Sequence, residues 1–248
     1  MNLLVWILAP LIGLFLGLFG AGGGMLTVPL LVYGLGFPIK QAIASSLWIV
    51  AGVSLIAALH QRAWKVIHPA LLVFFSAGGI IGSMGGAWLG TWIDSELQQG
   101  LFGVLLVIVA VWTWRSRLHE SPPRMDSCHC LAAFIVGCGL GLLTGLLGVG
   151  GGFLMVPALI ALGISHFPTA VAHSLVLITI NAISSGITYQ GRIPSSPETM
   201  LLIGSLAAVG SIFGSHLLKR IPVKPLQKIF SIGIALLGLT MLIQLMIA

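Results

Sequence analysis

The hydrophobic and polar positions divide the chain into ten apolar segments, separated by glycine, proline or charged residues. Two segments hold only ten or eleven residues, whereas a helix that crosses a bilayer needs about 20. The pattern therefore predicts an all-α polytopic membrane protein with two short half-helices among longer spans. The segments cover residues 2–20, 25–35, 41–59, 69–92, 97–114, 131–148, 153–162, 169–189, 198–217 and 226–247.

Both short segments directly follow three glycines, at residues 22–24 and 150–152. Each is predicted to fold back against the apolar segment before it, as a broken hairpin. The glycine-rich tip would lie at membrane depth, where irregular backbone is tolerated only if it is buried or lines a cavity. Each half of the chain is thus predicted to hold one broken hairpin and three transmembrane helices.

The two halves share one sequence pattern. Residues 13–29 read GLFLGLFGAGGGMLTVP and residues 141–157 read GLLTGLLGVGGGFLMVP, at an offset of 128. Such duplication is typical of transporters that bind substrate between their halves, at interrupted helices. We expect one transmembrane domain (1–248), composed of repeat 1 (1–117), a cytosolic linker (118–130) and repeat 2 (131–248).

Composition supports a membrane protein, since 58% of residues are hydrophobic, 6% are charged and the mean hydropathy is +1.12. The net charge of +6 lies in short loops, where it indicates orientation rather than a nucleic-acid partner. With inverted repeats, every Lys and Arg except Lys40 and Arg192 falls on one side; parallel repeats would divide them almost equally. The positive-inside rule thus favours inverted repeats in the plasma (inner) membrane, with cytosolic loops at Arg62 and Lys219.

The glycine tips are the first candidate binding site. No Asp, Glu, Lys or Arg lies in the middle of a predicted span, so binding would use backbone, hydroxyl, amide and imidazole groups. The unpaired N–H groups and positive dipole at each half-helix start suit an anion. The alternative is close packing, our interpretation of Gly13-x-x-x-Gly17 and Gly141-x-x-x-Gly145. The tip residues are Gly22, Gly23, Gly24, Gly150, Gly151 and Gly152.

A second polar group lies near the start of the third segment of each half. Ser45 and Ser46 in the first half correspond to His173 and Ser174 in the second. The hydroxyls either complete the hydrogen-bond shell of an anion or bond to their own helix carbonyls. Asn181 is a further substrate-binding candidate, because an amide in an apolar span must find a partner.

Three side chains are candidates for gating or proton coupling. Histidine changes charge near neutral pH, so His173 either couples proton and anion movement, supplies positive charge, or stays neutral and fills space. Gln61 and Gln190 follow the third segments, where they either gate the two mouths or cap helices. Cys128 and Cys130 lack the paired spacing of a structural zinc site, and we expect no metal and no cofactor.

The glycine pattern ending in Pro29 and Pro157, followed in each half by an Ala-x-Ser-Leu sequence, resembles the sulfite exporter TauE/SafE family of membrane permeases. The resemblance covers nearly the whole chain. It implies a duplicated helical transporter that exports small sulfur-containing anions, such as sulfite or organosulfonates. The matching positions are Gly22 to Gly24, Pro29, Ser46, Gly150 to Gly152, Pro157 and Ser174, whereas His173 replaces the serine found at Ser45.

Other functions are left open by the sequence. A carrier of metals or organic cations is disfavoured because the spans lack carboxylates, and a non-transporting assembly factor would have no polar cavity. An intramembrane enzyme would need a serine and a histidine in contact; the candidates are Ser83, Ser174, Ser211, His173 and His216. The paired broken helices favour transport of a small sulfur anion across the lipid bilayer, with homo-oligomerisation left open.

Overall fold

The computed structural model describes residues 3–19, 23–115, 130–148, 152–164, 166–190, 192–193, 197–217 and 223–247. Within these ranges the chain is helical, without strands, and each predicted segment corresponds to one helix with bounds that agree within three residues, except that segment 25–35 is divided between α2 and the π-helical turn that follows it. The helices are α1 (Leu3–Phe19), α2 (Gly23–Pro29), α3 (Ile39–His60), α4 (Pro69–Trp92), α5 (Ser95–Arg115), α6 (Cys130–Leu147), α7 (Gly152–Ala161), α8 (Phe167–Tyr189), α9 (Pro197–Leu217) and α10 (Val223–Ile247).

Among the described residues, six helices are long and apolar enough to cross a membrane, namely α3, α4, α5, α6, α8 and α9. Proline marks several helix starts. Pro69 and Pro197 open α4 and α9, where the missing N–H would have no partner in any case. The protein is therefore an integral, multi-pass membrane protein, as the composition predicts.

The short helices have the form expected of broken hairpins. α2 has only seven residues and ends at Pro29, and a π-helical turn, η1 (Leu30–Gly34), continues it. Proline lacks the N–H that an α-helical ladder needs, which accounts for the change of helix type. Phe15 and Leu26 line the same cavity as Leu8 and Leu30, so α2 and η1 run back along α1. α7, with ten residues, follows α6 in the second half.

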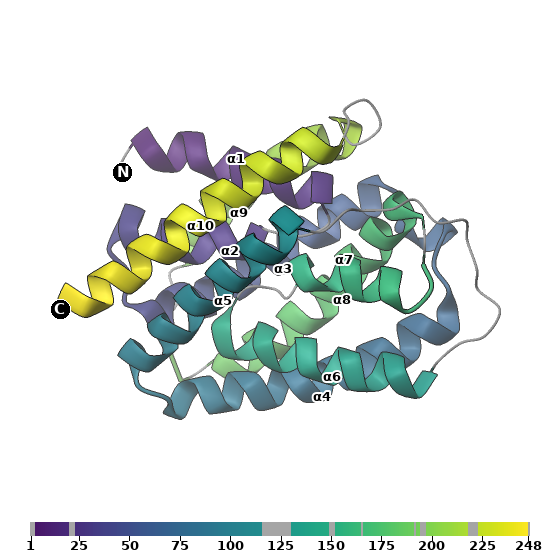
Figure 1. Ribbon diagram of the computed structural model, residues 1–248, viewed down its shortest axis with the longest axis horizontal. Coiled ribbons are helices and arrows are strands. Elements are labelled where there is room, and N and C mark those ends of the chain that lie inside the picture. The colour runs from purple at the N-terminus through teal and green to yellow at the C-terminus, as the bar shows by residue number, and fades with distance from the viewer. Residues whose placement is uncertain are drawn as a thin grey trace.

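The first helix of each half packs against the last but one helix of the other half. Figure 1 shows α4 and α6 side by side along one edge of the molecule, with α1, α9 and α10 along the opposite edge. α5 packs on α10, and α3 packs on α8. The two halves are therefore interlocked.

Glycines allow close packing in the helix pairs α1–α9 and α4–α6. A Cβ on Gly13 or Gly17 would collide with the backbone of α9, and one on Gly141 or Gly145 with the backbone of α4. Helices in lipid associate through such van der Waals packing, since lipid tails offer no hydrophobic driving force. The predicted packing role of both Gly-x-x-x-Gly spacings is confirmed.

Equivalent helices of the two halves cross in opposite directions. Along α5 and α10, Gly100 lies near Leu245 whereas Trp114 lies near Lys228, so residue numbers rise on one helix as they fall on the other. In α3 and α8, Trp48 lies near Gly186 and Ser54 contacts Thr179, with the same reversal. Antiparallel crossing of equivalent helices is the arrangement expected of inverted repeats.

The reversal gives the bundle two chemically different ends. One end, called the basic end, carries the described side chains Arg62, Lys65, Arg115 and Lys228. The other, called the opposite end, carries Lys40, whose Nζ donates to the Thr91 carbonyl at 3.2 Å. It also holds Arg192 and all the carboxylates within the described ranges, namely Asp94, Glu96 and Glu198.

Candidate functional site

Buried hydroxyl and amide groups, here called the polar centre, lie where α3, α4 and α8 meet. Ser54 Oγ and Thr179 Oγ1 are 2.9 Å apart and join α3 to α8. The hydroxyls of Ser83 and Ser184 bond to each other and join α4 to α8. Because these groups come from three helices inside the membrane bundle, they form a hydrophilic layer at depth. Asn181 is the remaining member.

Asn181 has the least complete bonding in the polar centre. Its side chain is fully buried, and neither Oδ1 nor Nδ2 has a hydrogen-bond partner within the described part of the chain. The amide lies against Gly79 of α4, where any side chain would collide with it. An unsatisfied buried polar group costs about 1–3 kcal/mol. Such a group calls for an explanation other than stability, such as a ligand or a water.

Ser46 joins α3 to the second broken hairpin. Its hydroxyl lies 2.8 Å from the carbonyl oxygens of both Ile43 and Gly148. Gly148 follows α6 with a φ of 68°, a left-handed conformation that favours glycine, and a Cβ there would press on Ile43 and Ser46. The hydroxyl of Ser46 thus positions the hairpin, whereas the buried hydroxyl of Ser45 has no partner among the residues described.

In the second half, the equivalent pair is bonded to nearby backbone. Ser174 Oγ donates to the Val171 carbonyl at 2.8 Å, within its own helix. His173 Nδ1 lies 2.8 Å from the Thr169 carbonyl oxygen, and His173 Nε2 accepts the backbone N–H of His68 at 2.9 Å. A nitrogen that faces a carbonyl must donate and one that faces an N–H must accept, so the ring is neutral. The geometry supports a neutral, hydrogen-bonded His173 in this state; proton coupling stays a prediction.

The glycine tips lie only partly within the described residues. Gly23 and Gly24 open α2, and Gly152 opens α7. The anion-binding role of the tips therefore stays a prediction. The tip residues Gly22, Gly150 and Gly151, together with linker residues 118–129 and hence Cys128, lie outside the described ranges.

Two cavities open at the two ends of the α3–α8 pair. The larger, the basic-end cavity, has a volume of about 540 Å³, and the smaller, the opposite-end cavity, about 200 Å³. Ala172 lines the first and Ala44 the second, and these residues are equivalent in the two repeats. Gln61 and Gln190 likewise line one cavity each. The polar centre lies along the same helices, between the two ends.

The lining of the two cavities differs in chemistry. The basic-end cavity is lined by His60, Gln61, Arg62, Val66, His166, Pro168, Thr169, Ala172, Ser215 and His216. The opposite-end cavity is lined by Ala44, Trp48, Gly186, Tyr189, Gln190, Ile193 and Met200. Among the described residues, neither lining includes a carboxylate, and only the first includes charged or imidazole side chains. Both gating candidates lie where a gate would act, although gating itself stays a prediction.

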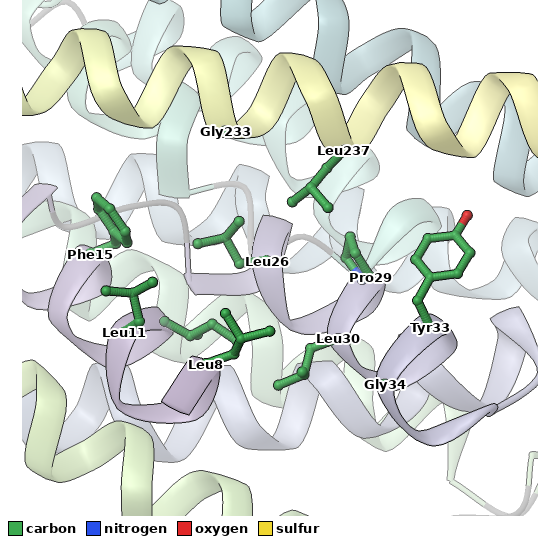
Figure 2. A pocket seen from close by; sticks show the side chains of 11 residues that line it. Leu8, Leu11, Phe15, Leu26, Pro29, Leu30, Tyr33, Gly34, Gly233 and Leu237 are labelled. Atoms are coloured by element: carbon green, nitrogen blue, oxygen red, sulfur yellow. The ribbon is translucent and has the colours of Figure 1, made fainter. Parts of the chain in front are cut away.

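A third cavity, of about 370 Å³, separates the first broken hairpin from α10. Figure 2 shows Leu237 of α10 directed toward Leu26, and Phe15 and Leu11 on the α1 side. Tyr33 stands at one end, and its hydroxyl is the one side-chain polar group among the described lining residues. An apolar lining of this kind does not suit an anion.

Comparison with known proteins also indicates a membrane transporter. Residues 5–241 match the family model described as "Sulfite exporter TauE/SafE". The chain belongs to the sulfite exporter TauE/SafE family. The predicted resemblance is confirmed, and this TauE/SafE protein is accordingly a member of a membrane transporter family. No solved structure matches it.

Similar TauE/SafE relatives are named as probable membrane transporter proteins. One from Xylella fastidiosa is 33% identical over 189 residues, which cover 73% of this chain but 66%, just under two thirds, of the relative. One from Methanocaldococcus jannaschii is 28% identical, over 97% of this chain and 95% of the relative. One from Bacillus subtilis is 24% identical, over 94% and 96%. These names state transport without a substrate.

The serine and histidine candidates for catalysis do not form a matched pair. Ser83 bonds to Ser184, Ser211 Oγ donates to the Ala208 carbonyl, and both nitrogens of His173 bond to backbone. His216 Nδ1 bonds to the Ile212 carbonyl at 3.0 Å. A nucleophile needs a base within hydrogen-bond reach, and none of these hydrogen bonds joins a serine to a histidine.

Sequence reasoning missed the histidine cluster of the basic-end cavity. His60, His166 and His216 stand far apart in the sequence and come from α3, α8 and α9. One signal was available, since each lies at an end of a predicted span on the side rich in Lys and Arg. The contact of Asn181 with Gly79 was also missed, because nothing in the sequence pairs α8 with α4.

Proposed function

We propose that this protein transports small anions, with sulfur oxyanions and short organosulfonates as the substrate class, by alternating access around the polar centre. The main support is the pair of cavities at opposite ends of α3 and α8, which are lined by equivalent residues of the two repeats. Buried hydroxyls and the amide of Asn181, which has no partner among the described residues, lie between them. Inverted repeats that exchange access to one central site are a general transporter design.

The charges support an anion rather than a cation. The described spans hold no carboxylate in their interior, and the cavity linings offer imidazole, guanidinium, amide and hydroxyl groups. Hard cations prefer carboxylate and carbonyl oxygens. Asn181 and Ser45, whose polar atoms lack partners within the described part of the chain, are the proposed donors to the anion, Asn181 at the polar centre and Ser45 next to Ala44 of the opposite-end cavity. The glycine tips are further proposed contacts.

The direction follows from the distribution of charge. Lys and Arg residues gather at cytosolic loops of membrane proteins, so the basic end is proposed to face the cytosol. An anion attracted to that end would leave through the opposite end. The proposed function is therefore export across the plasma membrane.

The test is counterflow in proteoliposomes. Vesicles containing the purified protein are loaded with unlabelled sulfite, sulfate, thiosulfate, acetate or methanesulfonate, and uptake of the corresponding labelled anion is measured under reducing conditions. We expect accumulation with at least one sulfur anion, and little with acetate or with protein-free vesicles. Equal uptake of every anion, or none of any, would overturn the proposal.

A further inference from the structure

The basic-end cavity gathers positive and titratable side chains from three helices. Arg62 and His60 come from the end of α3, His166 from the residue before α8, and His216 from the end of α9. A volume of about 540 Å³ accommodates a small oxyanion with several waters, each of which occupies about 30 Å³. The cavity is therefore large enough to hold a hydrated anion before it reaches the polar centre.

Among the described residues, the charge at this mouth has one sign. Arg62 and nearby Lys65 are the charged side chains described at this mouth, whereas Asp94, Glu96 and Glu198 all lie at the opposite end. Without a carboxylate partner, a positive cluster attracts anions and concentrates them in the cleft that it lines. Arginine is the side chain best suited to an oxyanion, because its planar fork donates two parallel hydrogen bonds.

The imidazoles add charge in an anion-dependent way. The rings of His60 and His216 lie 4.9 Å apart between centroids. His216 Nδ1 faces the Ile212 carbonyl at 3.0 Å, and His166 Nδ1 lies 3.0 Å from Thr169 Oγ1. Both rings can donate N–H hydrogen bonds to one anion bound beside them, and a nearby anion favours the charged form of a histidine.

The other titratable groups near this mouth, within the described ranges, do not cancel the charge. His68 and His173 stack at 5.6 Å between centroids, and both nitrogens of His173 are bonded to backbone. Lys65 lies in the turn after α3 and adds a positive charge. Every such group that faces the cavity from α3, α8, α9 or the turn before α4 is thus positive or becomes so on protonation.

The cavity also lies beside the first broken hairpin, a segment that the proposed alternating-access mechanism involves. Gln61 lines it, and Gln61 Nε2 donates to the Gly17 carbonyl at 3.2 Å, close to the end of α1 and the first glycine tip. Ala172 of α8, which also lines it, directly precedes His173 and Ser174. An occupant of the cavity would therefore lie next to the first broken hairpin.

We propose that the basic-end cavity is a capture site for small oxyanions, held by Arg62 and by the imidazoles of His60, His166 and His216. The site is distinct from the central site at Asn181, and its ligand class rests on the proposed function. Its role is to load the transporter from the basic end.

The test measures anion binding and transport separately. Binding of sodium sulfite and sodium sulfate to purified full-length protein is titrated calorimetrically at pH 6 and pH 8, in wild type, Arg62→Gln, the double variant His60→Gln/His216→Gln, and Arg192→Gln. Arg192 is the matched control, because it is an exposed arginine at the opposite end. Thermal unfolding without anion verifies that each variant is folded.

The capture site predicts that Arg62→Gln weakens binding on the order of tenfold, the loss expected for one charge-assisted hydrogen bond. For sulfate, whose charge is the same at both pH values, wild type should bind more tightly at pH 6 than at pH 8, the double histidine variant should lose that difference, and Arg192→Gln should match wild type. Equal affinity of Arg62→Gln and wild type, or an equal loss in Arg192→Gln, would overturn the inference.

Transport separates the inference from the proposed function. In vesicles, Arg62→Gln should raise the KM for sulfite and leave the maximal rate unchanged. If wild type transports sulfite and Arg62→Gln has the same KM, the capture site is wrong and the transporter remains. If wild type binds sulfite through Arg62 but moves no anion, the proposed function is wrong and the binding site remains.

Discussion

The two ends of the α3–α8 pair occupy equivalent places in the two repeats, yet they differ in chemistry. Ala44 and Ala172 are equivalent, and each lines one cavity. Around Ala172 lie imidazoles and Arg62, whereas around Ala44 lie Trp48 and Tyr189. The comparison teaches that the duplicated fold places one cavity at each end of the bundle. The different side chains around the two cavities make the ends unequal, and transport in one direction requires such a difference.

The helix interfaces, in contrast, have stayed alike in both halves. Gly13 and Gly17 of α1 meet the backbone of α9, as Gly141 and Gly145 of α6 meet that of α4. We therefore expect opposite results from mutations at the helix interfaces and mutations at the two cavities. Equivalent changes at the interfaces should have equal effects in both halves, and equivalent changes at the mouths should not.

The largest effect is expected at the exchanged interfaces. Leucine at Gly17 or Gly141 would place a side chain into the backbone of the partner helix. Overpacking costs about 1–3 kcal/mol where neighbours can move, and a partner backbone moves less easily than a side chain. Both variants should lose thermal stability and monodispersity in detergent, measured by heating and gel filtration.

Gly139→Leu is the control for this pair, because Gly139 of α6 faces open space. It should behave as wild type. A stable Gly141→Leu protein, or a Gly139→Leu protein damaged to the same degree, would contradict the interlocked arrangement.

The next effect is expected at the polar centre. Asn181→Leu replaces an amide that has no hydrogen-bond partner among the described residues by an apolar group of similar size. Transport of the substrate anion should fall at least tenfold, by about 1.4 kcal/mol or more of lost interaction, whereas thermal stability should hold or rise. Transport and melting temperature are measured on the same preparation. Loss of both together would indicate a structural role instead.

A smaller effect is expected at the second hairpin. Gly148 and Gly36 both have a positive φ, of 68° and 70°, but a Cβ would meet Ile43 and Ser46 only at Gly148. Alanine at either position should cost about 1–2 kcal/mol of backbone strain. Gly148→Ala should cost more than Gly36→Ala in thermal unfolding, and equal losses would show that the hairpin contact contributes nothing.

The smallest effect compares the two glutamines. Gln61 Nε2 donates to the Gly17 carbonyl, whereas Gln190 is exposed. Gln61→Ala should lower the free energy of unfolding by about 0.5–1.5 kcal/mol, and Gln190→Ala by less than about 0.5 kcal/mol. Chemical denaturation of the two variants in one detergent measures the difference. A reversed order would argue against the Gln61 contact.

Much of this fold could be predicted from the sequence, because apolar length and glycine runs report membrane spans directly. The pairing of the short helix α2 with α1 and the packing of Gly141 and Gly145 are examples. The pairing of α4 with α6 could not be predicted, since Gly78, Gly82 and Gly86 offer a stripe that would fit several glycine-lined helices.

The candidate site was predicted less completely. Asn181 stood out, because an amide in an apolar helix is unusual, and the structure leaves it without a partner. Ser46 and His173 stood out equally, yet their hydrogen bonds go to Gly148, His68 and Thr169. Spacing along one helix does not reveal which backbone groups a second helix presents. Only three-dimensional packing distinguishes a side chain that joins two helices from one that is free to bind substrate.

The most direct test of alternating access uses the equivalent pair Ala44 and Ala172. Each is replaced by cysteine in a background with Cys128, Cys130 and Cys138 changed to serine, and thiol labelling is measured in oriented vesicles with and without sulfite. The account predicts that sulfite changes labelling of the two positions in opposite directions, as one mouth closes and the other opens. Labelling that changes in the same direction at both, or at neither, would contradict it.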